Sequence, residues 1–102
     1  MKITWTENAL AETKEIFYFY KRKVTVKVAN KVKRDIFSAV RNLKNHPLQG
    51  QIESLLKDKP DEYRYLIAGQ YKIIYKIIES EIFIIKVFDC RRNPVIISII
   101  EK

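Results

Sequence analysis

The first half of the chain contains two stretches in which apolar positions recur at helical spacing. In the first stretch these positions are Ala9, Leu10, Thr13, Ile16, Phe17 and Tyr20. Thr6 precedes them as an N-cap with Glu7 in the first turn, and the helix is expected to run to about Lys23. The second helix is expected to start near Thr25 and to continue until Pro47 stops it. Its apolar positions are Val28, Val32, Ile36, Ala39, Val40 and Leu43. The short link between the two helices predicts an antiparallel hairpin.

The second half of the chain carries the pattern of strands. Segments rich in isoleucine, valine, tyrosine and phenylalanine cover residues 63–67, 71–78 and 82–88, with turns predicted at 68–70 and 79–81. A further short strand is expected at residues 2–5. Residues 46–60 are predicted to be mostly loop, because Pro47, Gly50 and Pro60 break any periodicity, with Ile52, Leu55 and Leu56 as candidates for a short buried turn.

The length of each turn decides which side chains share a face of the sheet, because a slip of one residue moves every side chain to the other face. A three-residue connection at 79–81 keeps one face wholly apolar, whereas an even connection would bring the unpaired charge of Lys86 onto it at a cost in free energy. The apolar face is then expected to hold Ile73, Tyr75, Ile77, Phe83, Ile85 and Val87, together with Tyr63, Tyr65 and Ile67. The opposite face is expected to carry Arg64, Lys72, Lys76 and Lys86.

These elements predict an α+β fold. An N-terminal strand and a two-helix antiparallel hairpin pack on a twisted antiparallel sheet of about four strands, and the row of cations stays on the uncovered face. The 102 residues, 47% of them hydrophobic, suffice for one core, so residues 1–102 are predicted to form a single domain.

Composition removes several classes of protein. The apolar runs are far shorter than the roughly 20 residues needed to cross a bilayer. The N-terminus lacks the regions of a signal peptide, so a cytoplasmic location and no membrane partner are expected. One cysteine and one histidine build neither a disulfide nor a tetrahedral zinc site, and two glycines make no phosphate-binding loop. No metal and no cofactor are expected.

The charge is concentrated in one segment. The net charge is +8, and residues 21–44 hold nine basic residues against one acid, while the remaining charges cancel. Such a local excess attracts a polyanion or an acidic protein segment, although it also occurs on ordinary solvated helices. Lys27, Lys31, Arg34 and Arg41 cluster opposite the apolar stripe of the second helix. Tyr18 and Phe19 fall outside the apolar stripe of the first helix, so at least one aromatic edge is a candidate for exposure.

Candidate chemistry is limited to phosphate recognition by arginine and lysine. Arg64 and Arg91 are suited to bidentate hydrogen bonds with phosphate oxygens, or to stabilising a phosphoryl-transfer transition state. Lys57 and Lys59, in the loop that leads to Arg64, are candidates for a third cation or a general acid–base. His46 and Cys90 have no partner for nucleophilic catalysis and favour structural roles.

Several short motifs in order carry a family resemblance. They are Trp5 in the first strand, Leu43-x-x-x-Pro47-x-x-Gly50 after the helices, Tyr63-Arg64-Tyr65-Leu66, Gly69-Gln70-Tyr71-Lys72-Ile73-Ile74-Tyr75, and Val87-Phe88-Asp89-Cys90-Arg91-Arg92-Asn93-Pro94. Together they resemble the RelE/ParE superfamily of toxins from type II toxin–antitoxin, or plasmid stabilization, systems. The resemblance covers nearly the whole chain. It implies a helical hairpin packed on an antiparallel sheet, inhibition of growth, and neutralisation by a cognate antitoxin.

The two branches of the superfamily imply different targets. RelE-like members cut mRNA on the ribosome with basic residues of the open sheet face, and Arg64 and Arg91 match their arginines, with Lys57 or Lys59 standing for the loop lysines. ParE-like members inhibit DNA gyrase. After Pro94 this chain lacks the terminal Tyr or His of many RelE-like nucleases, and residues 91–94 look closer to ParE-like members. The resemblance therefore favours inhibition of gyrase. A ribosome-dependent mRNA endonuclease is the first alternative, and a non-toxic nucleic-acid-binding module that uses residues 21–44 is the second.

Three sets of residues follow as predictions. The catalytic set, for a RelE-like activity only, is Arg64 and Arg91. The set that binds nucleic acid or the target is Lys57, Lys59, Lys72, Lys76, Lys86 and Arg92. The set that binds an acidic or amphipathic antitoxin is Tyr18, Phe19, Lys27, Lys31, Arg34 and Arg41. The isoleucine-rich residues 95–100 are expected to pack as a last strand or turn, with cover by a partner as the alternative.

Overall fold

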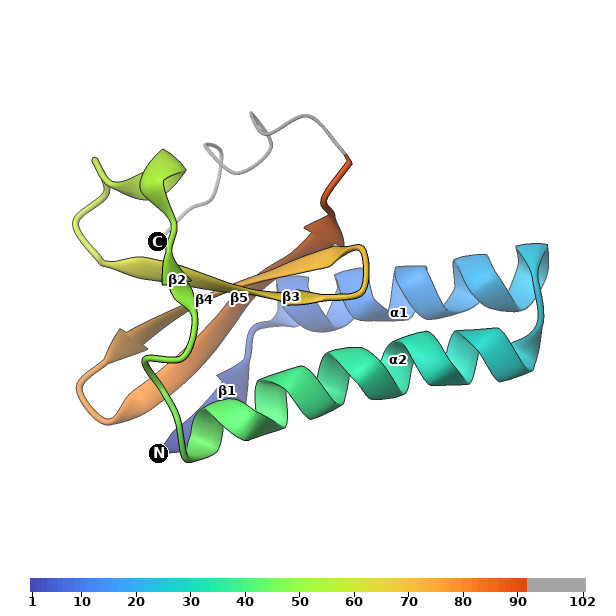
Figure 1. Ribbon diagram of the computed structural model, residues 1–102, viewed down its shortest axis with the longest axis horizontal. Helices are drawn as coiled ribbons and strands as arrows, with labels where there is room; N and C mark the ends of the chain where they lie inside the picture. Colours follow the sequence, from blue (N-terminus) through green and yellow to red (C-terminus); the bar gives the residue numbers. More distant parts are fainter. Residues whose placement is uncertain (92–102) are drawn as a thin grey trace.

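A computed structural model describes residues 1–91 and shows two helices packed on a five-stranded sheet (Figure 1). The helices are α1 (Glu7–Lys23) and α2 (Val26–Arg41), followed by the 3₁₀ turns η1 (Asn42–Lys44) and η2 (Ser54–Leu56). The strands are β1 (Lys2–Trp5), β2 (Gln51–Ile52), β3 (Tyr63–Ala68), β4 (Tyr71–Ile78) and β5 (Glu81–Asp89). Their order in the sheet is β1-β5-β4-β3-β2. The predicted α+β class is confirmed.

The sheet differs from the prediction in two ways. It has five strands instead of about four, because a two-residue strand, β2, forms within the predicted loop and pairs with β3. It is also mixed, since β1 runs parallel to β5 while the other pairs are antiparallel. Residues 92–102, with Arg92 and the predicted packing of residues 95–100, lie outside the described residues.

Both helices begin where their capping residues predict. The hydroxyl oxygen of Thr6 accepts a hydrogen bond from the backbone N–H of Ala9 (3.2 Å), and that of Thr25 accepts one from Val28 (3.1 Å). The helix α2 ends at Arg41, somewhat earlier than predicted, and η1 carries the chain on toward Pro47. Local sequence signals therefore place the hairpin correctly.

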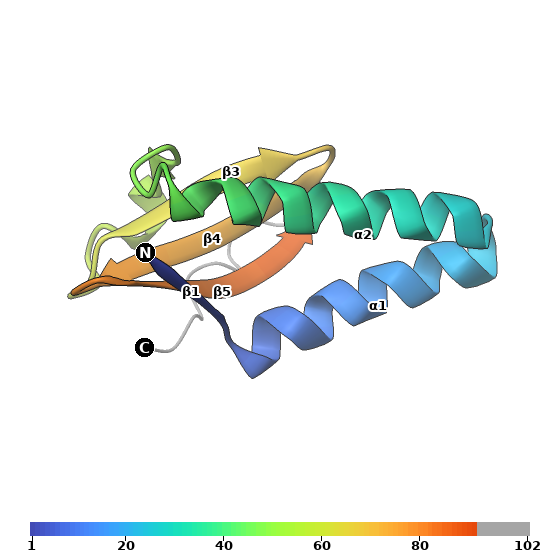
Figure 2. The same ribbon diagram turned by 90° about the horizontal axis from the view of Figure 1, so that it is seen from below.

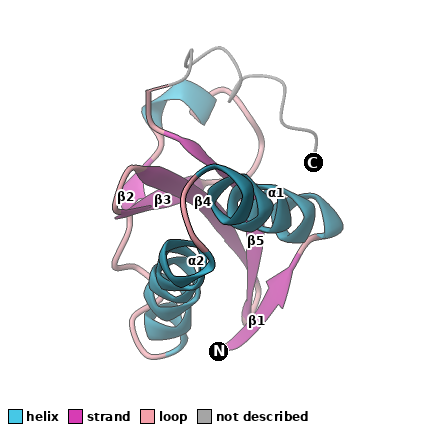
Figure 3. Cartoon of the chain, turned by 90° about the vertical axis from the view of Figure 1, so that its right-hand side faces the viewer, coloured by secondary structure: helices cyan, strands magenta, loops and turns pink. Residues whose placement is uncertain are grey.

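The hairpin covers one face of the sheet, and the segment around η2 covers part of the other (Figures 1 and 3). The core beneath the helices includes Ile36 and Val40 of α2 packed against Ile73, Tyr75 and Ile84 of the sheet. Full burial of one such aliphatic side chain contributes roughly 1.5–3 kcal/mol. The helices continue beyond the strands, so the turn between them projects from the sheet (Figures 1 and 2). None of the helices in residues 1–91 has the length and apolar character needed to span a membrane.

The predicted register of β5 is wrong for two positions. The turn after β4 holds only Glu79 and Ser80, and Ile77 pairs with Ile82. Without further change this register would place Lys86 opposite Ile73, on the face beneath the helices. A β-bulge avoids this, because Ile85 has no partner and Ile73 pairs with Val87.

The bulge restores the predicted apolar face by another route. Ile82, Ile84 and Val87 are buried beneath the helices. Phe83 and Ile85, predicted on that face, do not belong to this core, and Ile85 packs with the cluster on the other face. The face predicted for Phe83 and Ile85 was wrong because the turn holds two residues and the bulge adds one residue to β5 partway along the strand.

The predicted orientation of β3 is also wrong. The turn that joins β3 to β4 holds two residues, Gly69 and Gln70, so Arg64 pairs with Tyr75 and Leu66 with Ile73. Arg64 and Leu66 therefore face the helices. The tyrosines and the isoleucine that were predicted on that face, Tyr63, Tyr65 and Ile67, lie on the opposite one. There Tyr63 forms a second apolar cluster with Leu56, Ile74 and Phe88, and Tyr65 and Ile85 pack against it.

Arg64 holds the loop that precedes it. Its guanidinium Nη1 donates a hydrogen bond to the carbonyl oxygen of Gly50 (2.8 Å), and its Nη2 lies 3.5 Å from the carboxylate of Glu62. The side chain is only 18% exposed. The side chain of Arg64 therefore anchors the 47–53 segment to β3. It lies on the face of the sheet beneath the helices, opposite the face on which the row of cations was predicted.

We expect Arg64→Met to lower the free energy of unfolding by about 2 kcal/mol, because the carbonyl of the buried Gly50 loses a charged donor while the alkyl packing is kept. Urea denaturation followed by circular dichroism measures the change. Lys57→Met, at an exposed position, is the matched control and should stay within about 0.5 kcal/mol of the parent. Equal free energies of unfolding for the two variants would contradict the role of Arg64 as an anchor of this segment.

Candidate functional site

The lysines of the open sheet face are neutralised by the loop that crosses it. The Nζ atom of Lys72 lies 2.5 Å from the buried carboxylate of Glu53 and 4.2 Å from the centre of the Tyr65 ring. The Nζ atom of Lys76 lies 3.0 Å from Asp61. These two lysine side chains are only 18% and 9% exposed. Both are held in ion pairs and offer little free charge to a ligand.

Lys86 is engaged elsewhere. β1 pairs with β5 only as far as Ile84, so Lys86 lies where β5 is the edge of the sheet. Its Nζ atom lies 2.5 Å from the carboxylate of Glu12 on α1, whose other oxygen accepts a hydrogen bond from the backbone N–H of Val87 (2.9 Å). The predicted row of four cations on one open face is therefore not formed, since Arg64 faces the helices and Lys86 reaches α1.

The two predicted catalytic arginines do not come together. Arg64 is level with Tyr75 of β4, whereas Arg91 follows Asp89, which pairs with Tyr71. Four residues of strand separate these levels, about 13 Å. Arg91 is an exposed side chain that binds Asp89 through Nη2 (2.6 Å) and Nε (3.0 Å). This hydrogen bond and the charge of Asp89 raise the pKa of the Arg91 guanidinium.

The loop lysines remain accessible. Lys57 is exposed and Lys59 is half-buried, both just after η2. The predicted target-binding residues of residues 1–91 thus divide into accessible loop positions and paired sheet positions.

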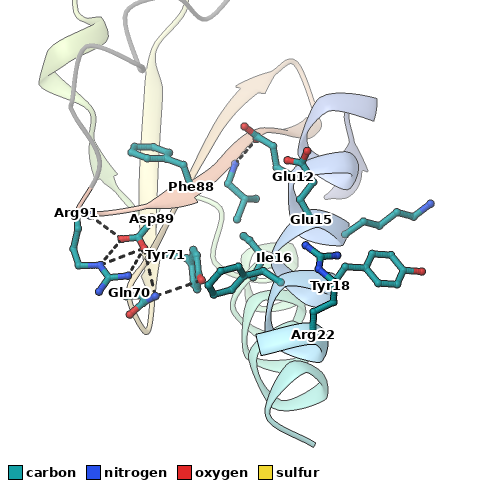
Figure 4. A pocket seen from close by; sticks show the side chains of 13 residues that line it. Glu12, Glu15, Ile16, Tyr18, Arg22, Gln70, Tyr71, Phe88, Asp89 and Arg91 are labelled. Carbon is teal, nitrogen blue, oxygen red and sulfur yellow. Dashed lines mark hydrogen bonds and ion pairs between the residues drawn. The ribbon is translucent and has the colours of Figure 1, made fainter. Parts of the chain in front are cut away.

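A groove of about 680 Å³ lies between α1 and the ends of β4 and β5 (Figure 4). Its apolar lining includes Ile16, Phe19 and Phe88. Arg22 lines it from the helix, and Arg91 from the end of the sheet (Figure 4). The groove therefore combines an apolar lining with charges of both signs, since Glu12, Glu15 and Asp89 line it together with Lys14, Arg22 and Arg91.

A hydrogen-bonded network closes the strand end of this groove. The hydroxyl of Tyr71 donates to that of Tyr20 (3.1 Å), and the amide of Gln70 donates to Tyr20 (2.9 Å) and to Asp89 (3.4 Å). Burial, with the hydrogen bond to Tyr20, raises the pKa of Tyr71 to about 12. Tyr71 therefore stays a neutral donor in the physiological pH range, and the network fixes this wall of the groove.

The sequence analysis missed most of the groove. Its strand side includes Gln70, Tyr71, Phe88 and Asp89, which none of the predicted sets contains, besides the predicted Arg91. All four carried a signal in the sequence, because they belong to the motifs of the family resemblance. Their spatial meeting depends on the pairing of Tyr71 with Asp89, which the sequence pattern did not provide.

The predicted antitoxin-binding residues lie on two separate surfaces. Tyr18 and Phe19 of α1 are 48% and 49% exposed, and both line the groove. The four cations predicted with them, Lys27, Lys31, Arg34 and Arg41, are exposed on α2, and no residue of α2 lines the groove. Within residues 1–91, no three His, Cys, Asp or Glu side chains gather as a metal-ligand set.

Comparison with solved structures identifies the same fold in three toxins. A chromosomal ParDE toxin–antitoxin system from P. aeruginosa matches with a TM-score of 0.73 and 23% identity, covering 87% of this chain and 95% of that chain. A YoeB dimer from Staphylococcus aureus matches with a TM-score of 0.56 and 16% identity, covering 84% and 92%. A mutant of E. coli toxin RelE in the free state matches with a TM-score of 0.53 and 20% identity, covering 88% and 83%. At these identities the likeness establishes the fold.

The family is established by the sequence itself. No curated protein matches the chain. The model of a family described as "ParE toxin of type II toxin-antitoxin system, parDE" matches residues 3–94, which include every helix and strand described above except the first residue of β1. The chain therefore belongs to the ParE toxin family of type II toxin–antitoxin systems.

Proposed function

We propose that this protein inhibits growth by inhibiting DNA gyrase, and that a cognate antitoxin neutralises it by laying an amphipathic segment in the groove beside α1. The observation that carries the proposal is the match of the ParE toxin family over residues 3–94. The similar P. aeruginosa structure, which is a ParDE toxin–antitoxin system, supports an antitoxin as the partner.

The placement of the cations supports gyrase over mRNA cleavage. A RelE-like nuclease uses basic residues of the open sheet face, by the resemblance stated above. In this chain Lys72 and Lys76 are held by Glu53 and Asp61, and Arg64 is bound to the carbonyl of Gly50. Releasing a lysine for phosphate chemistry would leave a partly buried carboxylate unpaired, at a cost of several kcal/mol. Residues 95–102 also contain neither tyrosine nor histidine.

The accessible part of the predicted target-binding set is the better candidate for contact with gyrase. Lys57 is exposed, and Lys59 lies two residues further along the same loop. Arg91 projects into solvent at the end of β5 with its charge partly compensated by Asp89. Arg92 follows directly in the sequence and is kept as a proposed contact.

The groove fits an amphipathic segment that carries acidic residues. Apolar side chains of the segment would bury the exposed ring of Phe19 and the lining around Phe88. Carboxylates on the same segment would meet Arg22 on one wall and Arg91 on the other. Tyr18, which also lines the groove, adds a second exposed ring to this contact.

Expression of the chain alone is expected to arrest growth, and co-expression of the small reading frame adjacent to its gene is expected to restore it. The purified protein is expected to inhibit supercoiling by gyrase at stoichiometric concentration, and purified antitoxin is expected to reverse this inhibition. Supercoiling on agarose gels and primer extension on translated mRNA measure the two candidate activities side by side.

The two readouts separate the alternatives for the target. Intact mRNA with inhibited supercoiling supports the proposal. Unaffected supercoiling with mRNA cut in a ribosome-dependent way would replace it by the endonuclease alternative. Normal growth with both readouts unaffected would leave the non-toxic binding module.

Phe19→Glu is expected to weaken antitoxin binding about 30-fold or more, since it places a charge where the apolar part of the segment is buried. Isothermal titration calorimetry measures the affinity, and loss of rescue in the growth assay gives a second readout. Leu48→Glu is the matched control, because Leu48 is 65% exposed and does not line the groove. Equal affinities for the two variants would place the antitoxin elsewhere.

A further inference from the structure

The outer face of α2 carries a continuous polar stripe. Its six residues are Lys27, Asn30, Lys31, Arg34, Ser38 and Arg41. At about 100° per residue these positions fall within a narrow sector of the helix, opposite the buried Ala29, Ile36 and Val40. From its first to its last residue the stripe extends about 21 Å. All six side chains carry a hydrogen-bond donor, and four of them carry a positive charge.

The stripe keeps most of its charge free. Lys27 and Arg34 have no ion pair within residues 1–91, and Arg41 donates only to the neutral hydroxyl of Ser38 (3.1 Å). Only Lys31 is paired, with the exposed Asp35 at 2.9 Å, and an exposed pair of this kind is weak. The sheet lysines are neutralised by buried or half-buried carboxylates, whereas the stripe presents four exposed cations beside one exposed acid, Asp35.

The chemistry of the stripe selects its ligand. It contains no aromatic side chain on which a base of a single strand would stack. It contains no apolar side chain to enter a lipid surface or to bury the apolar face of a peptide. A straight row of Lys, Arg, Asn and Ser donors matches the phosphate backbone of a double helix.

We propose that α2 binds the phosphate backbone of duplex DNA through this stripe, independently of sequence. This binding adds to the proposed inhibition of gyrase and leaves the groove free, because no residue of α2 lines the groove. The four cations predicted for the antitoxin, Lys27, Lys31, Arg34 and Arg41, are thereby assigned to DNA, and Tyr18 and Phe19 remain with the antitoxin.

The number of cations sets the expected salt dependence. Four phosphate contacts give a slope of about −3.6 for the logarithm of the binding constant against the logarithm of the salt concentration. Between 50 and 200 mM salt the affinity should then fall about 150-fold. Fluorescence anisotropy of a labelled 20-base-pair duplex, titrated with the full chain, measures both quantities.

A pair of variants with the same net charge isolates the stripe. Arg34→Gln with Arg41→Gln is expected to reduce the slope to about −1.8, since two of the four contacts are lost. Lys2→Gln with Lys14→Gln removes two exposed charges elsewhere and is expected to keep the parent slope. Asp35→Asn, which frees Lys31, is expected to tighten binding a few-fold. Thermal melting checks that each variant is folded.

Several outcomes would overturn the proposal. Equal losses of DNA affinity in the two double variants would show that binding depends on net charge alone. Absence of binding to the duplex at 50 mM salt would show that α2 does not bind DNA. Tighter binding to duplex RNA, to single-stranded DNA or to vesicles with 30% phosphatidylserine would assign the stripe to another ligand. Loss of antitoxin affinity in Arg34→Gln with Arg41→Gln, with DNA binding unchanged, would return these cations to the antitoxin. The supercoiling assay is run on the same samples, so failure of gyrase inhibition is recognised separately.

Discussion

The hydroxyl of Tyr75 fixes the loop that joins the helical hairpin to β2 at the edge of the sheet. It is buried in the core, where it accepts a hydrogen bond from the backbone N–H of Gly50 (2.9 Å) and donates one to the carbonyl of Pro47 (2.8 Å). Burial raises the pKa of this hydroxyl, so it remains a donor. A Cβ at Gly50 would lie 2.6 Å from the carbonyl oxygen of Tyr65, so the close approach requires glycine. Arg64 anchors the same loop a second time through its hydrogen bond to the carbonyl of Gly50.

The position of this anchored loop determines which cations of the sheet are paired with carboxylates. Because residues 47–50 are fixed on β3 and β4, the chain that follows brings Glu53 to Lys72 and Asp61 to Lys76. The paired ammonium groups lie over aromatic rings of the second apolar cluster, Lys72 over Tyr65 and Lys76 over Tyr63. A face that the sequence predicted as an anion site is thus a second, small core with internal ion pairs. Exposed cations gather instead on the helical hairpin, whose little-exposed carboxylate, Glu12, is already paired with Lys86 of the sheet.

Local and non-local signals explain what the sequence could and could not predict. The two helices, the cap at Thr6, the start of the second helix near Thr25 and the main strands depend on neighbours within a few residues, and all were predicted. The register depends on turn length and on the bulge at Ile85, neither of which periodicity reveals. The even turn was rejected because it would bury Lys86, yet the bulge removes that objection by shifting the strand by one residue. Arg64 was misplaced for the same reason, since the parity of a single turn controls the face of a whole strand.

The same distinction separates the two proposed surfaces. The stripe on α2 follows from helical periodicity alone, so its four cations were grouped on one helix face from the sequence, although the stripe is now proposed for a different partner. The groove needs the register, because Asp89 and Tyr71 meet only when β4 and β5 are paired. ParDE, YoeB and RelE structures share this fold at low identity, so the fold leaves the target open and the side chains must determine it. In this chain, carboxylates hold Lys72 and Lys76 in little-exposed ion pairs, whereas Arg91, although paired with Asp89, and the cations of α2 are exposed. Pairing and exposure together, more than the count of basic residues, favour a structural role for these sheet lysines and make the exposed cations the candidates for contact with a partner.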